Sequence, residues 1–457
     1  MNDPSDLDVI RAAAEAAVAY AAAIDDRAVA PTSAALDALG AFDEDLPDGS
    51  GDGAATIELL ARVGGPATMG STGPDYFGFV NGATLPVALG ASFLVNAWDQ
   101  NAALPVMSPV AAAIHDVTSR WLNELLGLAT DTDIAFVTGA TVANATCLAA
   151  ARDTLLAERG WDVQRDGLFG APPIQVVVGA KAHSTLSKSL GLIGLGRDRV
   201  IVVPADDQGR MIAAELPDLD PADGPVLCCA QAGEVNTGAF DPFDPIADWV
   251  QARDGWLHVD GAFGLWALAD PSRAALVAGL ARADSLATDG HKWLNVTYDC
   301  GIVFVQRPGA LRRTFAAVAG YLPPESGFEA MHHTPQSSQR ARQVEVWAVL
   351  RTLGRDGVAA LVRQAGECAT AIADRLRADG VEILNDVVLN QVLVRLDDGA
   401  TTERLLTEVQ RDGRVWCGPT QWAGATAMRI SVSSWKTTPA DAARAANIIL
   451  ECAARVR

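Results

Sequence analysis

Lysine is scarce in this chain, with four among 457 residues, and acidic residues outnumber basic ones to give a formal net charge of −21. That charge opposes attraction to nucleic acid and to anionic membrane surfaces. No uninterrupted apolar run reaches membrane-spanning length, and the first residues lack the basic start and apolar centre of a secretory signal. We therefore expect a cytoplasmic protein that acts on a small molecule, with neither a nucleic-acid partner nor a membrane partner.

Cysteine is also sparse and irregularly placed. The seven cysteines include no Cys-x-x-Cys pair and no regular ladder. Such spacing predicts neither a zinc site nor a framework of disulfides, so we expect no metal and a reducing compartment.

The centre of the chain alternates short apolar runs with helical stretches. We expect strands at residues 133–138, 174–178, 200–203, 226–230, 256–260, 285–288 and 301–305. Continuous apolar strands separated by helices predict an α/β fold, with a mostly parallel central sheet covered by helices on both faces. Sheets of this kind bind ligands beyond the carboxyl ends of their strands.

The two flanking regions have other patterns. Residues 5–40 read as helical, and a further helix is expected between about 95 and 128. After about residue 345, a helix at 344–379 precedes short strands near 381–383, 392–395 and 428–432 and a closing helix. This order predicts a small α+β domain at the C-terminal end, in agreement with a chain too long for a single core.

Lys292 and Asp260 are the most informative pair of residues. Lys292 lies in Asp-Gly-His-Lys-Trp, and Asp260 ends a predicted strand in His-Val-Asp-Gly-Ala. An aldehyde cofactor needs an amine to hold it as a Schiff base, and its pyridine nitrogen accepts electrons while a nearby carboxylate keeps it protonated. The pair can supply both groups, although Lys188 competes for the amine role and Asp260 could instead cap the next helix.

Two further segments stand at predicted strand ends. Gly139, Ala140 and Thr141 join a strand to a helix, where small residues and free backbone amides can receive a phosphate group. The same three residues would also make an ordinary strand-to-helix turn. His183 follows another strand, where an imidazole can stack on a cofactor ring and bind a substrate carboxylate, or simply cap the helix.

The order of these segments resembles the group II pyridoxal phosphate-dependent decarboxylases, which include the aromatic L-amino acid, glutamate and tyrosine decarboxylases. The resemblance covers roughly residues 70–440. It implies the fold-type I architecture, with an N-terminal helical dimerisation segment at 1–95, a large cofactor-binding domain at 96–345 and a small C-terminal domain at 346–457. It also implies a homodimer with its active site at the interface.

The resemblance assigns roles to individual residues. It implies a cofactor site of pyridoxal 5'-phosphate formed by Gly139, Ala140, Thr141, His183, Asn236, Asp260, Ala262, His291 and Lys292. In this arrangement His183 stacks on the ring, Asp260 meets the pyridine nitrogen and Lys292 binds the aldehyde. Asp289 stands where relatives can have asparagine, and because a carboxylate would repel phosphate we expect no cofactor role for it.

The implied reaction is decarboxylation of an L-amino acid to an amine and carbon dioxide. Many relatives protonate the product with a loop tyrosine, whereas this chain has His332 and His333 in that stretch. We expect His333 to act as the general acid, although both could be solvated loop residues. This substitution leaves two alternatives open, oxidative deamination to an aldehyde and amino transfer.

Phe79 and Asn81 fall in the segment that the resemblance assigns to the substrate pocket. The aromatic character of this segment favours an aromatic L-amino acid as substrate. Asn81 adds a polar group, so a polar or acidic amino acid stays open. A non-catalytic member of the family would be expected to lack Lys292 or Asp260, and both are present.

Overall fold

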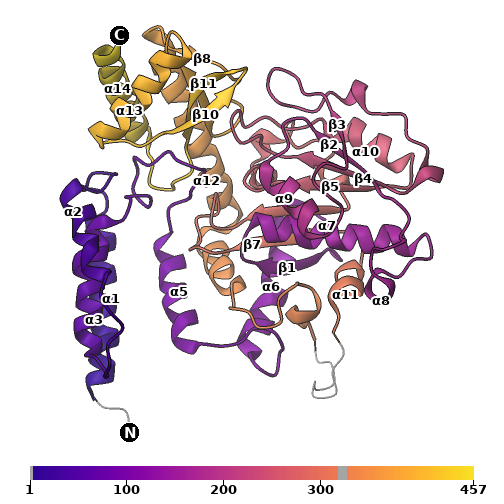
Figure 1. Cartoon of the computed structure of the whole chain (residues 1–457), viewed down its shortest axis with the longest axis horizontal. Helices are drawn as coiled ribbons and strands as arrows, with labels where there is room; N and C mark the ends of the chain where they lie inside the picture. The colour runs from indigo at the N-terminus through magenta and orange to yellow at the C-terminus, as the bar shows by residue number, and fades with distance from the viewer. Residues whose placement is uncertain (1–3, 318–326) are drawn as a thin grey trace.

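The computed structural model describes residues 4–317 and 327–457, which contain a seven-stranded sheet and a four-stranded sheet (Figure 1). The large sheet consists of β1 (Asp133–Val137), β2 (Gln175–Gly179), β3 (Val200–Val203), β4 (Val226–Gln231), β5 (Trp256–Asp260), β6 (Ser285–Asp289) and β7 (Gly301–Val305). Their order is β1-β7-β6-β5-β4-β2-β3. β7 is antiparallel to both of its neighbours, and the other pairs are parallel. The expected mostly parallel sheet is confirmed.

Both faces of the large sheet are buried except at the edge strand β3, where Val202 is 55% exposed, because alternate residues of the other strands pack against different helices. In β7, Ile302 and Phe304 join one apolar cluster, and Val303 and Val305 join another. The first cluster includes α6 (Pro109–Leu126), α10 (Phe243–Gln251) and α12 (Gln343–Ala378). The second includes α7 (Ala140–Ala157), α9 (Ser184–Leu192) and α11 (Ala310–Phe315). Burial on both faces is why these strands read as continuous apolar runs.

The small sheet is antiparallel, in the order β10-β11-β9-β8. It consists of β8 (Glu382–Ile383), β9 (Gln391–Arg395), β10 (Gly418–Trp422) and β11 (Ala425–Ser431), and it is accompanied by α13 (Gly399–Asp412) and α14 (Pro439–Val456). The sequence predicted three of these strands. It missed β10, whose Pro419 and exposed middle residues give no apolar run.

The N-terminal part is helical but more broken than expected. Its helices are α1 (Pro4–Ala23), α2 (Ser33–Asp37), α3 (Gly53–Leu59), α4 (Gly65–Ala67) and α5 (Pro86–Trp98). The single helix expected near 95–128 is wrong. The chain leaves α5 at Asp99 in a left-handed conformation, and α6 begins after Ser108, whose side chain accepts a hydrogen bond from the Ala111 amide. Figure 1 shows α1 and α3 at the edge of the molecule, away from the large sheet.

Short helical turns connect several of these elements. They are α8 (Val163–Asp166), η1 (Ala38–Phe42), η2 (Leu60–Gly64), η3 (Ala213–Glu215), η4 (Pro221–Asp223), η5 (Gly264–Ala269), η6 (Pro271–Arg273), η7 (Leu280–Arg282) and η8 (Ala330–His332). Across the described ranges, none of the helices combines the length and apolar character needed to cross a bilayer.

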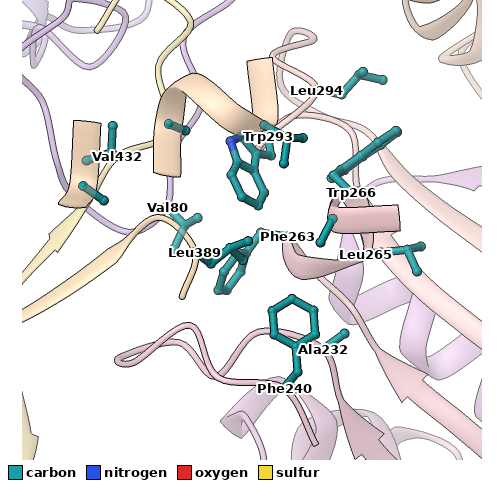
Figure 2. Close-up of a cluster of buried hydrophobic side chains, with 14 of the residues drawn as sticks. Val80, Ala232, Phe240, Phe263, Leu265, Trp266, Trp293, Leu294, Leu389 and Val432 are labelled. Atoms are coloured by element: carbon teal, nitrogen blue, oxygen red, sulfur yellow. The ribbon is translucent and has the colours of Figure 1, made fainter. Parts of the chain in front are cut away.

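Trp293 anchors the segment that carries the candidate lysine. Its indole is 1% exposed and lies near Phe263, with ring centroids 6.4 Å apart. Figure 2 shows it among side chains of the large sheet's loops together with Leu389 and Val432 from the C-terminal part. Truncating a buried tryptophan costs about 3–5 kcal/mol, so this side chain fixes the backbone on which Lys292 is mounted.

Candidate active site

Three candidate residues and Asp289 meet at one edge of the large sheet. Asp260 ends β5 and Asp289 ends β6, while Ala140 begins α7 after β1 and His183 caps α9 after β2. β2, β5 and β6 run in the same direction, and β7, which lies between β1 and β6, is antiparallel to both. The carboxyl ends of β1, β2, β5 and β6 therefore share an edge, where sheets of this type bind ligands.

Asp260 is a buried carboxylate held by its own turn. It is 4% exposed, and its Oδ1 accepts a hydrogen bond from the Ala262 amide at 3.2 Å. Burial raises the pKa of Asp260, while the charges of His183 and Lys292 and the Asn144 side chain lower it. The carboxylate thus stands within electrostatic reach of both the imidazole and the amine.

His183 both caps a helix and faces the site. Its Nδ1 accepts a hydrogen bond from the Thr185 amide at 3.3 Å at the start of α9. Burial lowers the pKa of His183, and the Asp260 carboxylate opposes this shift. Because Nδ1 accepts, the neutral ring carries its proton on Nε2, which can donate to a ligand. His183 can therefore cap α9 through Nδ1 and bind a ligand through Nε2 at the same time.

Lys292 pairs with Asp289, three residues before it. Lys292 Nζ lies 3.2 Å from Asp289 Oδ2, and the Lys292 side chain is 20% exposed. By contrast, the competitor Lys188 is exposed on α9. An amine that is largely covered and surrounded by charged groups suits covalent chemistry better than a solvated one.

The start of α7 forms the anion-binding end of the site. Gly139 precedes the helix, and the ideal Cβ of an alanine there would lie 3.4 Å from His291 Cε1. His291 Nδ1 accepts a hydrogen bond from the Cys300 amide at 3.1 Å, which aims Nε2 toward Asp289 Oδ2 at 3.7 Å. The Ala140 amide donates to Asp289 Oδ1 at 2.6 Å. This last contact was not expected from the sequence.

Asn236 and Ala262 flank the same region. The Asn236 amide nitrogen donates to Glu234 Oε1 at 2.9 Å, and its Oδ1 accepts from the Thr420 hydroxyl at 2.7 Å. Asn236 therefore links the loop after β4 to β10 of the small sheet. Ala262 accepts a backbone hydrogen bond from the Asp289 amide at 2.9 Å, so it lies between the two acidic strand ends.

Phe79 and Asn81 lie on a strained segment beside the lysine loop. Phe79 and its neighbour Val80 have left-handed backbone conformations, with φ of 54° and 58°. Phe79 is 58% exposed, and its ring lies 5.3 Å from that of Trp416. Asn81 Oδ1 accepts a hydrogen bond from the Tyr298 hydroxyl at 2.9 Å. Strain of this kind is concentrated at functional sites.

Tyr298 and Arg429 are site residues that the sequence reasoning missed. The Tyr298 ring lies 4.2 Å from that of His291. Arg429, on β11, lies near enough to His183 for its charge to lower the histidine pKa. A charged residue inside an otherwise apolar strand was the available signal for Arg429. Nothing in the pattern singled out Tyr298.

In the single chain, His332 and His333 lie in and directly after η8, and their contacts are with residues outside the group around Lys292. The His333 ring stacks on Phe328 with centroids 4.3 Å apart, and Phe328 stacks in turn on His115. His332 is buried and pairs with Glu329 at 3.1 Å. The structure does not bring either histidine beside Lys292, and the general-acid role of His333 remains a prediction.

The residues at this edge fit pyridoxal phosphate at its ring end. A largely covered amine, a buried carboxylate and an imidazole with a free Nε2 are the groups that its aldehyde, pyridine nitrogen and ring face require. At the phosphate end the α7 amides and His291 are suitable donors, and Asp289 is the one anion among them. Within the described ranges, no three histidine, cysteine or acidic side chains are grouped to hold a metal ion.

Comparisons with known proteins identify the family of this chain. Residues 60–397 match the family model described as the pyridoxal-dependent decarboxylase conserved domain. The chain is 26% identical over 345 residues to the aromatic-L-amino-acid decarboxylase of Bacillus atrophaeus, covering 73% of this chain and 69% of that protein. It is 31% identical over 340 residues to the L-2,4-diaminobutyrate decarboxylase of Rhizobium meliloti, covering 71% of this chain and 66% of that protein.

The fold is shared with solved structures along the whole chain. The crystal structure of Oryza sativa TDC with PLP and tryptamine superposes with a TM-score of 0.91 at 20% identity, covering 100% of this chain and 99% of that one. At this identity the likeness establishes the fold, and the expected fold-type I architecture is confirmed.

Proposed function

Since the chain belongs to the pyridoxal-dependent decarboxylase family, we propose that it removes the carboxyl group of an L-amino acid and releases the amine. The observation that carries this proposal is the convergence of Lys292 and Asp260 at one sheet edge, where each charge shifts the titration of His183. The relatives named above are decarboxylases of an aromatic and of a diamino substrate.

Pyridoxal phosphate, when bound, supplies a protonated pyridine ring that accepts the electrons of a bond broken at the substrate's Cα. Lys292 is the residue that would hold its aldehyde carbon. The Asp260 carboxylate has one oxygen engaged by the Ala262 amide and keeps lone pairs for the pyridine N–H. Gly139, Ala140, Thr141 and His291 would hold the phosphate.

We propose that His183 and Arg429 act on the substrate. His183 Nε2 can donate to a carboxylate, and burial lowers the pKa of His183. Arg429 donates to the Val235 carbonyl at 3.3 Å. A guanidinium has five N–H donors, so the remaining ones can bind a ligand. We expect His333 to supply the proton at Cα. This role requires that the two chains of the proposed homodimer be arranged so that the His333 loop reaches an active site.

An aromatic L-amino acid is the substrate we favour. Phe79 and Trp416 form an aromatic surface beside the lysine loop, and the relative of highest coverage among those named acts on aromatic amino acids. The second candidate is a polar or acidic amino acid, which the Tyr298–Asn81 hydrogen bond favours. A panel of amino acids assayed for amine, carbon dioxide and hydrogen peroxide separates these substrates and also separates decarboxylation from oxidative deamination to an aldehyde or amino transfer.

We infer that the protein is a cytoplasmic homodimer. Apolar side chains are exposed along α1 and α5, including Ile10, Leu94 and Trp98. Large apolar side chains that are exposed on a single chain are a feature of subunit interfaces. The helical segment at 1–95 would pack against the partner, and the domains at 96–345 and 346–457 would enclose the cofactor.

The assignment of Lys292 is tested by the visible absorbance of bound cofactor. We expect purified protein supplied with pyridoxal phosphate to show an absorbance band of the bound cofactor, and Lys292→Ala to lose it, because we propose that Lys292 forms the covalent bond. Lys188→Ala is the matched control and should keep the band. A band that survives in Lys292→Ala but disappears in Lys188→Ala would move the chemistry to α9 and reject the proposal.

A further inference from the structure

We propose that Asp289 competes with the phosphate of the cofactor for the N-terminus of α7 and thereby weakens the binding of the cofactor. This inference rests on the proposed function and concerns the same site. Asp289 would thus lower the affinity for the cofactor, whereas the residues proposed to hold the cofactor raise it.

The position of the Asp289 carboxylate carries the proposal. Its Oδ1 accepts a hydrogen bond of 2.6 Å from the Ala140 amide, the first residue of α7. The side chain is 4% exposed. An ideal Cβ on Gly139 would stand 3.5 Å from Asp289 Oδ1, so the carboxylate lies directly against the turn that precedes the helix.

Two further groups contact the Asp289 carboxylate, and one of them, His291, is also proposed to hold the phosphate. Asp289 Oδ2 lies 3.2 Å from Lys292 Nζ and 3.7 Å from His291 Nε2. Burial lowers the pKa of His291, and because its Nδ1 accepts a hydrogen bond from the Cys300 amide, Nε2 is the nitrogen that can donate. A helix N-terminus and an ammonium group together stabilise one anion well.

A phosphate at the same amides would stand beside a carboxylate that water barely reaches. Like charges a few ångströms apart repel strongly where the local dielectric is low. When phosphate binds, either the Asp289 carboxylate loses its hydrogen bond from the Ala140 amide, or the phosphate binds close to a like charge that repels it. Both outcomes reduce the affinity for phosphorylated ligands more than the affinity for ligands without a phosphate.

Replacing Asp289 by asparagine separates charge from shape. The asparagine Oδ1 can still accept from the Ala140 amide, but the negative charge and the ion pair with Lys292 disappear. We expect the variant without cofactor to be less stable than wild type, and yet to bind pyridoxal phosphate at least about tenfold more tightly, or about 1.4 kcal/mol. Opposite changes in stability and affinity distinguish competition from ordinary structural support.

The experiment titrates the full-length chain, freed of cofactor by dialysis, with pyridoxal phosphate, with pyridoxal and with inorganic phosphate. Visible absorbance follows the two aldehydes, and a shift in melting temperature follows phosphate. Asp398→Asn is the matched control, because Asp398 caps α13 by accepting from the Thr401 amide at 2.7 Å and lies outside the site. Asp289→Ser repeats the measurement with a second uncharged side chain.

Tighter binding of pyridoxal phosphate and phosphate in both Asp289 variants, with a smaller gain for pyridoxal, supports the competition. Equal or weaker binding of pyridoxal phosphate, or equal tightening of pyridoxal, overturns it. In either of the latter cases a coloured wild-type protein leaves the proposed function standing. A wild-type protein that takes up no coloured cofactor removes both proposals.

Discussion

Gly82 illustrates how a single residue without a side chain positions the candidate lysine. A Cβ built on Gly82 would lie 1.8 Å from the carbonyl oxygen of Lys292, a contact that no rotamer can relieve because the obstacle is backbone. The segment with Phe79 and Asn81 therefore passes directly over the lysine loop. Absence of a side chain at this position brings the substrate segment and the cofactor segment together.

We predict that Gly82→Ala displaces the Lys292 backbone. Overpacking of this kind costs about 1–3 kcal/mol, occasionally more, and should lower both the free energy of unfolding in urea and the visible band of bound cofactor. Gly90→Ala is the matched control, since a Cβ at Gly90 in α5 meets nothing within 4 Å. An undisturbed Gly82→Ala protein with a full cofactor band would contradict this role.

At the scale of elements, β5 is joined to its neighbours by a buried histidine that the chemistry does not use. His258 Nε2 lies 2.9 Å from Asn144 Oδ1 on α7, and Nδ1 lies 3.0 Å from the Ser285 hydroxyl on β6. Burial lowers the pKa of His258 from 6.5 to about 3. The strand that ends in Asp260 is thus held to a helix and to the next strand by a neutral imidazole.

This histidine should make the fold sensitive to acid. Between pH 6.5 and about 3 the unfolded chain binds a proton at His258 and the folded chain does not, so stability falls as pH falls, by up to about 1.4 kcal/mol per pH unit. Urea unfolding at several pH values should give a shallower dependence for His258→Gln than for wild type. Equal slopes for the two proteins would show that His258 titrates alike in both states.

At the scale of the whole molecule, the N-terminal helices leave apolar surface uncovered. Ile10 is 66% exposed on α1, and Leu94 is 53% exposed on α5. Figure 1 shows α1, α3 and α5 on the same side of the molecule, with α1 and α3 set apart from the large sheet. A second copy of the chain would cover these side chains.

We predict that the wild-type protein sediments as a dimer and that Leu94→Arg together with Trp98→Arg shifts it toward the monomer, because buried charge without a partner opposes association. Sedimentation velocity over a range of concentrations measures this. Phe169→Arg is the matched control, as Phe169 is fully exposed on a loop before β2. A monomeric wild-type protein would refute the homodimer.

The sequence determined the strands of the large sheet, because segments buried on both faces must be apolar along their length. It also indicated the order of the candidate residues, since each follows a strand and parallel strands share an edge. It did not reveal β10, the break between α5 and α6, or Tyr298. Tyr298 and β10 have partners distant in sequence, Asn81 for Tyr298 and Asn236 for Thr420, whereas the break between α5 and α6 has the local signal Ser108, which caps α6.

Only the tertiary structure decided which groups the charged and titratable side chains contact. From the sequence, Asp289 was assigned no cofactor role on grounds of repulsion, whereas the fold places its carboxylate between the α7 amide and Lys292. His333 reads as a candidate acid, yet within one chain it packs on Phe328. A residue type fixes which protons and charges are available, but distances of a few ångströms between segments far apart in the chain decide which of them meet.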